Sequence, residues 1–137
     1  MITVSKKEKL LSLHRYYIWA NKMRDHFDST LMTSVTKDGS NGMDAFMYMG
    51  YWYGTIYAVA EGWIELGLKD DAINTLLKSD NLGLLKRYRN GVFHYQKEYN
   101  DARFTDLYLK GREVVDWVRQ LNQELGRYFL DEMNIHQ

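Results

Sequence analysis

Apolar residues recur at helical spacing along most of the chain. Between residues 5 and 31 they fall every three or four positions, which places them on one face of a helix. They are Leu10, Leu13, Tyr17, Ala20, Phe27 and Leu31. Ser5 and Glu8 have the spacing of a capping box, so this helix is predicted to begin at Ser5. Arg24 lies on the apolar face, where we expect it to form an ion pair or to extend its charged end into water.

The second predicted helix, from Asp44 to Leu66, carries a row of very small side chains. The row repeats every fourth position, at Gly50, Gly54, Ala58 and Gly62. A glycine inside a helix costs about 1 kcal/mol relative to alanine, so we expect the row to permit the close approach of another helix. That helix belongs either to the same chain or to a second copy.

A single acidic residue, Glu61, lies between residues 45 and 64. A carboxylate among so many aromatic side chains needs a cationic partner. Arg24 and the arginines at positions 87 and 89 are the candidates, and we expect a structural ion pair rather than a catalytic acid.

The remaining apolar pattern predicts shorter helices and one longer final helix. Asp70 or Asp71 is expected to cap a short helix through Leu77, and Ser79 or Asp80 to open the next one. Residues 98–103 are predicted to form a loop, with Thr105 capping the final helix. The apolar face of that helix consists of Leu107, Val114, Val118, Leu121, Leu125 and Tyr128. Without proline or strand-like alternation, the chain is predicted to be all-α: an antiparallel helical bundle of four to five helices in one domain, residues 1–137.

Composition narrows the classes of function. The net charge is zero, which argues against bulk electrostatic capture of nucleic acid and restricts any RNA contact to a local patch. Cysteine is absent, which excludes disulfides and thiolate metal sites. No secretory signal or bilayer-spanning apolar run is recognisable, so we expect a cytoplasmic protein without a membrane partner. Aromatic residues make up 15% of the chain, a high content, and such additional aromatic area often goes into a large interface as well as a core.

Chemistry-bearing side chains concentrate between residues 86 and 97. This stretch holds four cations, two amides, an imidazole and several aromatic rings: Lys86, Arg87, Tyr88, Arg89, Asn90, Phe93, His94, Tyr95, Gln96 and Lys97. A guanidinium stabilises negative charge at a phosphate, and an imidazole moves protons near neutral pH. On an uninterrupted helix His94 lies about 140° around from Arg89. We therefore expect the helix to distort or end near Gly91–His94, where glycine permits a break.

The motif Arg89-Asn90-Gly91-Val92-Phe93-His94, in the penultimate segment of a short helical chain, resembles that of the HEPN family. The resemblance implies a metal-independent, toxin-like or defence endoribonuclease that acts as a homodimer on RNA, without a metal or other cofactor. His94 is then the general acid/base, Arg89 stabilises the phosphate transition state, and Asn90 contacts phosphate or orients the pair. The surrounding Lys86, Arg87, Tyr95 and Lys97 are predicted to bind substrate. The products carry 2′,3′-cyclic phosphate and 5′-hydroxyl ends.

One position departs from a branch of this family, and three alternatives stay open. In one toxin branch a tyrosine stands two positions after the histidine, where this chain has Gln96. The first alternative is an inactive HEPN-like dimer that binds a nucleotide or a partner protein such as an antitoxin. The second is a DNA-damage-inducible helical family that holds a metal with three histidines, to which the segment from Tyr17 to Asn21 is similar. His14, His26 and His136 are the further histidines available to it. In the third, Arg89 and His94 form only a helix-end salt bridge and a capping imidazole.

Overall fold

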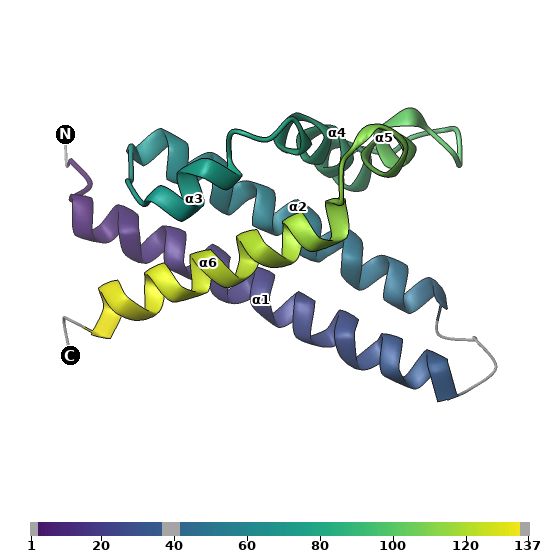
Figure 1. Ribbon diagram of the computed structural model, residues 1–137, viewed down its shortest axis with the longest axis horizontal. Coiled ribbons are helices and arrows are strands. Elements are labelled where there is room, and N and C mark those ends of the chain that lie inside the picture. The colour runs from purple at the N-terminus through teal and green to yellow at the C-terminus, as the bar shows by residue number, and fades with distance from the viewer. Residues whose placement is uncertain (1–2, 37–41, 135–137) are drawn as a thin grey trace.

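The computed structural model describes residues 3–36 and 42–134, and its regular elements are six α-helices. They are α1 (Lys6–Thr36), α2 (Gly42–Leu66), α3 (Asp71–Leu76), α4 (Asn81–Phe93), α5 (Ala102–Lys110) and α6 (Val114–Asn134). The predicted all-α class is confirmed. Helices α1 and α2 form a long antiparallel pair, α6 crosses that pair, and α4 and α5 lie together beside α2 (Figure 1). Within the described ranges, no helix is long and apolar enough to cross a bilayer.

Local caps explain where several helices begin. The Ser5 hydroxyl accepts the backbone N–H of Glu8 at 3.1 Å, as the capping-box spacing predicts. At the start of α3 the Asp70 carboxylate accepts the backbone N–H of Ile73 at 3.1 Å. Both caps depend on residues three positions apart, which is why the sequence pattern locates them.

The C-terminal third differs from the prediction. Instead of one final helix capped by Thr105 there are two, and α5 begins at Ala102 because the Asp101 carboxylate accepts the backbone N–H of Arg103 at 2.9 Å. The predicted loop over residues 98–103 is correspondingly shorter, and the helix count is six among the described residues rather than four to five. The break before α6 includes Glu113, whose φ is 47°, a left-handed conformation that interrupts a helix.

The core is rich in large aromatic side chains and draws on all six helices. Its fully buried members include Trp52, Tyr53, Trp63, Ile73, Leu85, Tyr88, Leu107, Leu121, Leu125 and Phe129. The indole N–H groups find acceptors: Trp63 donates to the Asn74 side chain at 2.8 Å, and Trp117 donates to the Leu76 carbonyl at 3.0 Å. Leu31, predicted for the buried face of α1, is 39% exposed, so that face ends before the last turns of the helix.

The small-residue row of α2 is a contact within the chain. A methyl group at Gly50 would lie 3.4 Å from Val92 of α4, and one at Gly54 would lie 2.5 Å from the Phe93 ring. At Gly62 the neighbour is Leu13 of α1, also 2.5 Å from such a methyl group. The predicted close approach is therefore confirmed, and both approaching helices belong to the same chain.

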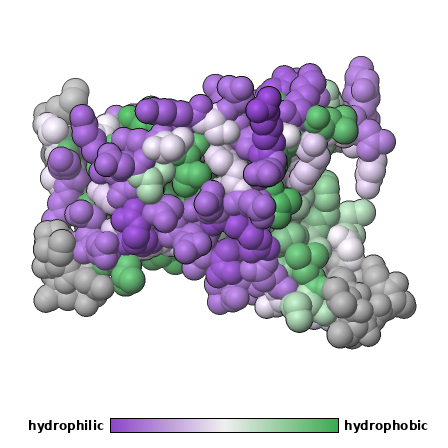
Figure 2. Space-filling model, viewed as in Figure 1, coloured by the Kyte–Doolittle hydropathy of each residue, from purple (hydrophilic) through white to green (hydrophobic). Residues whose placement is uncertain are grey.

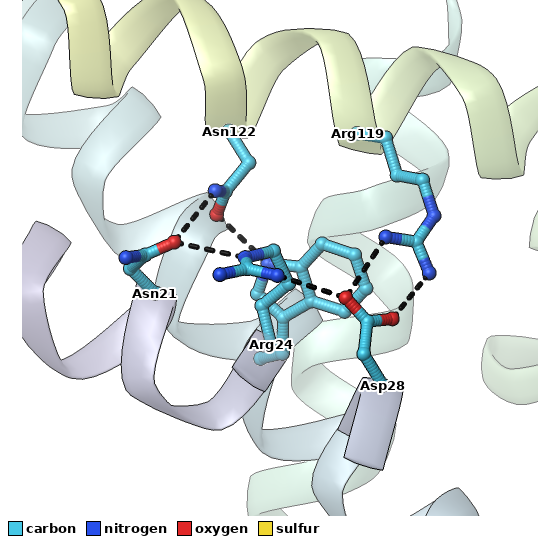
Figure 3. A network of polar contacts seen from close by, with 6 residues as sticks. Asn21, Arg24, Asp28, Arg119 and Asn122 are labelled. Carbon is cyan, nitrogen blue, oxygen red and sulfur yellow. Dashed lines mark hydrogen bonds and ion pairs between the residues drawn. The ribbon is translucent and has the colours of Figure 1, made fainter. Parts of the chain in front are cut away.

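A network of polar side chains joins α1, α2 and α6 (Figure 3). The Trp52 indole N–H donates to the side-chain oxygen of Asn122 at 2.9 Å, and the Asn122 amide donates to Asn21 at 3.1 Å. Arg24 also donates to the Asn21 side chain, at 2.9 Å. Asn122 is only 4% exposed, so its two hydrogen bonds replace those it would make with water.

Asp28 extends this network to a second arginine. It accepts hydrogen bonds from Arg119 of α6 at 2.7 and 3.3 Å and from Arg24 at 2.8 Å (Figure 3). The Arg119 hydrogen bonds hold the pKa of Asp28 below its ordinary value, against the opposing effect of burial, and Arg24 adds to the lowering. The ion pair expected for Arg24 is thereby confirmed, with Asp28 as its partner.

Replacing Asn122 by leucine should weaken the fold. The substitution keeps the branched shape of the side chain but leaves the buried Trp52 N–H without an acceptor, so we expect the free energy of unfolding to fall by about 2 kcal/mol. Urea denaturation measures the change. Gln123→Leu, at an exposed neighbouring position of α6, is the matched control. Equal stability of the two variants would show that the network contributes nothing measurable.

Candidate functional site

The candidate imidazole lies just beyond the end of a helix. Helix α4 ends at Phe93, and His94 has an extended backbone with φ −122° and ψ 123°. Its backbone N–H still donates to the Asn90 carbonyl at 3.0 Å, which ties the residue to the last turn. The side chain is exposed. The predicted helix end near Gly91–His94 is therefore confirmed, and His94 leaves the helical register of Arg89.

Gly91 was predicted to permit a break in the helix, but in the structure it has a packing role. It lies inside α4, not at a break, and it is buried. A methyl group there would lie 3.1 Å from the Cβ atom of Arg103 and 3.2 Å from the ring of Phe104, both on α5. Glycine at this position thus allows α5 to pack closely against the turn that precedes His94.

This contact can be tested with two glycines of the same helix. Nothing lies within 4 Å of a methyl group placed at Gly83, so Gly83→Ala should stabilise the protein by up to about 1 kcal/mol through helix propensity. Gly91→Ala gains the same propensity but must displace α5, so we expect it to be less stable than Gly83→Ala by about 2 kcal/mol. Thermal or urea unfolding of both variants provides the comparison. Equal stabilities would mean that α5 moves away without cost.

Arg89 is held by contacts that leave its charge uncompensated. Its guanidinium carbon lies 4.9 Å from the centroid of the Tyr57 ring on α2, and its Nε donates to the side-chain oxygen of Asn90 at 2.9 Å. None of the ion pairs of the described residues includes Arg89. The neighbouring Arg87, by contrast, pairs with Asp106 at 3.2 Å.

Tyr57 receives opposing influences from its neighbours. Burial raises the pKa of Tyr57, the nearby Glu61 carboxylate raises it further, and Arg89 lowers it. Glu61 is exposed and belongs to no ion pair of the described residues, so the ion pair predicted for it is not formed there. The tyrosine ring, not that carboxylate, is the direct neighbour of the Arg89 guanidinium.

The segment after His94 is fixed by side chains that the sequence did not single out for this purpose. Gln96 donates to the His94 carbonyl at 2.8 Å, and its side-chain oxygen accepts from Arg103 at 2.9 Å. Arg103 also pairs with Asp101, the residue that caps α5. Gln96, at the position of a tyrosine in one HEPN branch, thus links the backbone of His94 to the start of α5.

The predicted site residues comprise a catalytic group and a substrate-binding group. Arg89 and Asn90 are joined by a hydrogen bond, and His94 follows at the helix end. The predicted substrate-binding residues lie around them on α4 and its following loop: Lys86, Tyr95 and Lys97 are exposed, and Arg87 is ion-paired with Asp106. Tyr57 and Arg103 were missed, because each reaches the site from another helix, which no local pattern reveals.

The alternative of a three-histidine metal site gains no support from the described residues. Within these ranges no three histidine, aspartate or glutamate side chains gather in a way that could hold a metal ion. His14 lies against Phe129 with a ring separation of 5.2 Å, and His26 stacks on Tyr48 at the same separation. His136 lies outside the described residues.

Comparison of the chain with protein-family models, curated proteins and solved structures gave no match. The assignment of function therefore rests on the chemistry of residues 86–97 and their neighbours.

Proposed function

We propose that this protein is a metal-independent endoribonuclease of HEPN type, active as a homodimer. The observation that carries the proposal is the state of the arginine–histidine pair. Arg89 has no carboxylate partner among the described residues and is bonded to Asn90, and His94 is exposed immediately beyond the helix end. A guanidinium without a carboxylate partner can stabilise the charge that develops on a phosphate, and an accessible imidazole can move the protons of a transesterification.

The proposed reaction proceeds by attack within the RNA. The neutral imidazole of His94 takes the proton of a 2′-hydroxyl, and the resulting oxygen attacks the adjacent phosphorus. The bond from phosphorus to the 5′-oxygen of the next nucleotide breaks, and that oxygen receives a proton from a protonated imidazole. The products are a 2′,3′-cyclic phosphate and a 5′-hydroxyl. Because residues 86–97 supply only one imidazole, the second is provided by the other copy.

Asn90 prepares Arg89 for this step. Its side-chain oxygen holds the Nε–H group of Arg89 at 2.9 Å, which fixes the plane of the guanidinium. The two terminal nitrogens then remain to donate to phosphate oxygens as negative charge develops on them. The Tyr57 ring supports the guanidinium without neutralising its charge.

An exposed apolar row supports pairing of two copies near this site. Met43, Met47 and Tyr51 follow one another at four-residue spacing on α2, and the Tyr51 ring stacks on Phe93, 6.1 Å between centroids. All four side chains are between 42% and 66% exposed. Figure 2 shows apolar surface gathered at the right of the view, toward the end where α2 begins. Methionine and aromatic side chains are enriched at protein interfaces, and this apolar row ends one residue before His94.

Cleavage of RNA in the presence of EDTA tests the proposal. The purified protein is expected to cut a mixed-sequence RNA at an unchanged rate when all divalent metal is chelated, because the reaction uses only an imidazole and a guanidinium. Gel analysis of labelled RNA measures the rate. If no RNA is cut but a nucleotide or partner protein raises the melting temperature, the inactive, ligand-binding alternative replaces the enzyme.

A further inference from the structure

Two tyrosines on the connection between α4 and α5 are nearly free of contacts. Tyr95 is 91% exposed and Tyr99 is 83% exposed, more than any other large apolar side chain among the described residues. A tyrosine that serves only the fold buries most of its ring. Both residues follow His94 within five positions, in the connection that begins at the candidate site.

The backbone that carries these rings is held in place. Gln96, between the two tyrosines, bonds to the His94 carbonyl and to Arg103, and Asp101 anchors the loop to the start of α5. The loop is thus fixed at both ends by hydrogen bonds between 2.8 and 2.9 Å, while its aromatic side chains remain outside the core. A fixed backbone reduces the entropy lost when a ligand binds to the rings.

The charges near the loop favour the binding of an anionic chain, whatever its base sequence. Lys97 lies between the tyrosines and belongs to no ion pair of the described residues, and Lys86 and Arg89 on α4 are likewise unpaired. Arg103 is neutralised by Asp101, and Glu98 opposes Lys97 in the loop itself. With so small an electrostatic surplus, aromatic stacking must supply much of the affinity.

We propose that Tyr95 and Tyr99 form a stacking platform for unpaired nucleobases beside the scissile phosphate, so that the substrate is single-stranded RNA. This inference rests on the proposed function and names its substrate class. Exposed aromatic rings stack on the faces of unpaired bases, and each such contact contributes appreciably to affinity. In a duplex those faces are covered by neighbouring base pairs, and the platform offers them nothing.

The test measures binding separately from cleavage. On the His94→Ala background, fluorescence anisotropy is recorded with a labelled oligouridylate of about 12 nucleotides and with an RNA duplex of equal length. Tyr95→Ala and Tyr99→Ala should each weaken single-strand binding by about tenfold and leave duplex binding unchanged. Tyr95→Phe and Tyr99→Phe keep the ring and should bind within about twofold of the parent. Tyr16→Ala, an exposed tyrosine on α1, is the control.

Each outcome decides the inference. Unchanged single-strand affinity in the alanine variants overturns it, as does an equal loss for single strand and duplex. A loss accompanied by conversion of a dimer to a monomer in sedimentation also overturns it, because the tyrosines are then an interface between copies. If the tyrosines are needed for binding but the wild-type protein cuts no RNA, the platform stands and the nuclease proposal fails. If cleavage and single-strand binding depend on neither tyrosine, the nuclease proposal stands and the platform fails.

Discussion

His94→Ala is expected to reduce RNA cleavage by on the order of 10³-fold. In the proposed reaction the imidazole serves as the base in one copy and as the acid in the other, so the substitution would remove both proton transfers from the proposed dimer. Because His94 is exposed, its loss should leave the free energy of unfolding nearly unchanged. Initial rates on a labelled RNA in EDTA, with thermal unfolding of the same sample, measure the two effects separately.

Arg89 provides the companion variants. Arg89→Ala should lower the rate by about 10²-fold or more, since it removes the charge that we propose stabilises the phosphate. Arg89→Lys should recover only part of the loss, because lysine lacks the planar fork and the Nε–H bond to Asn90. Arg112→Ala, at an exposed arginine outside the site, is the control. Full activity in both His94→Ala and Arg89→Ala would remove the roles assigned to these residues.

The double substitution Met43→Glu with Met47→Glu is expected to abolish both pairing and cleavage. The two methionines are 66% and 42% exposed on α2, so charged side chains there are tolerated by the monomer. Four carboxylates would then face one another in a dimer that uses the apolar row, and like charges in a desolvated interface cost several kcal/mol. Sedimentation should show half the wild-type mass, and the cleavage rate should fall at least about 100-fold.

A matched variant separates this effect from charge alone. Leu11→Glu with Ile18→Glu adds the same two carboxylates at positions of α1 that are 48% and 50% exposed. This variant should remain dimeric and active, because neither residue belongs to the apolar row. A monomeric Met43→Glu, Met47→Glu protein with wild-type cleavage would show that one copy suffices.

Local helix structure was predictable from the sequence, and the partners of contacts between distant segments were not. The Ser5 and Asp70 caps and the helix end before His94 follow from residues within a few positions of each other. The division of the C-terminal third was missed, because apolar positions continue across the break and the left-handed backbone of Glu113 has no sequence signature. The glycine row predicted a close approach, but only the fold identifies α4 and α1 as the approaching helices.

In the candidate site, too, local features were predictable and contacts between helices were not. The motif residues were recognisable because they occupy one short stretch, whereas Tyr57 supports Arg89 from another helix. The ion pair between Arg87 and Asp106 also joins two helices, so no local sequence pattern revealed it. Gln96 could be noted only as a departure from one family branch, since its link to Arg103 depends on how α5 packs against α4.

Mass spectrometry of the RNA fragments released by the wild-type protein in EDTA tests the central chemistry most directly. We predict fragments that end in a 2′,3′-cyclic phosphate and begin with a 5′-hydroxyl, because in the proposed reaction the attacking oxygen comes from the RNA itself. Fragments with a 3′-hydroxyl and a 5′-phosphate, the signature of attack by water with loss of the 3′-oxygen, would contradict the proposed reaction.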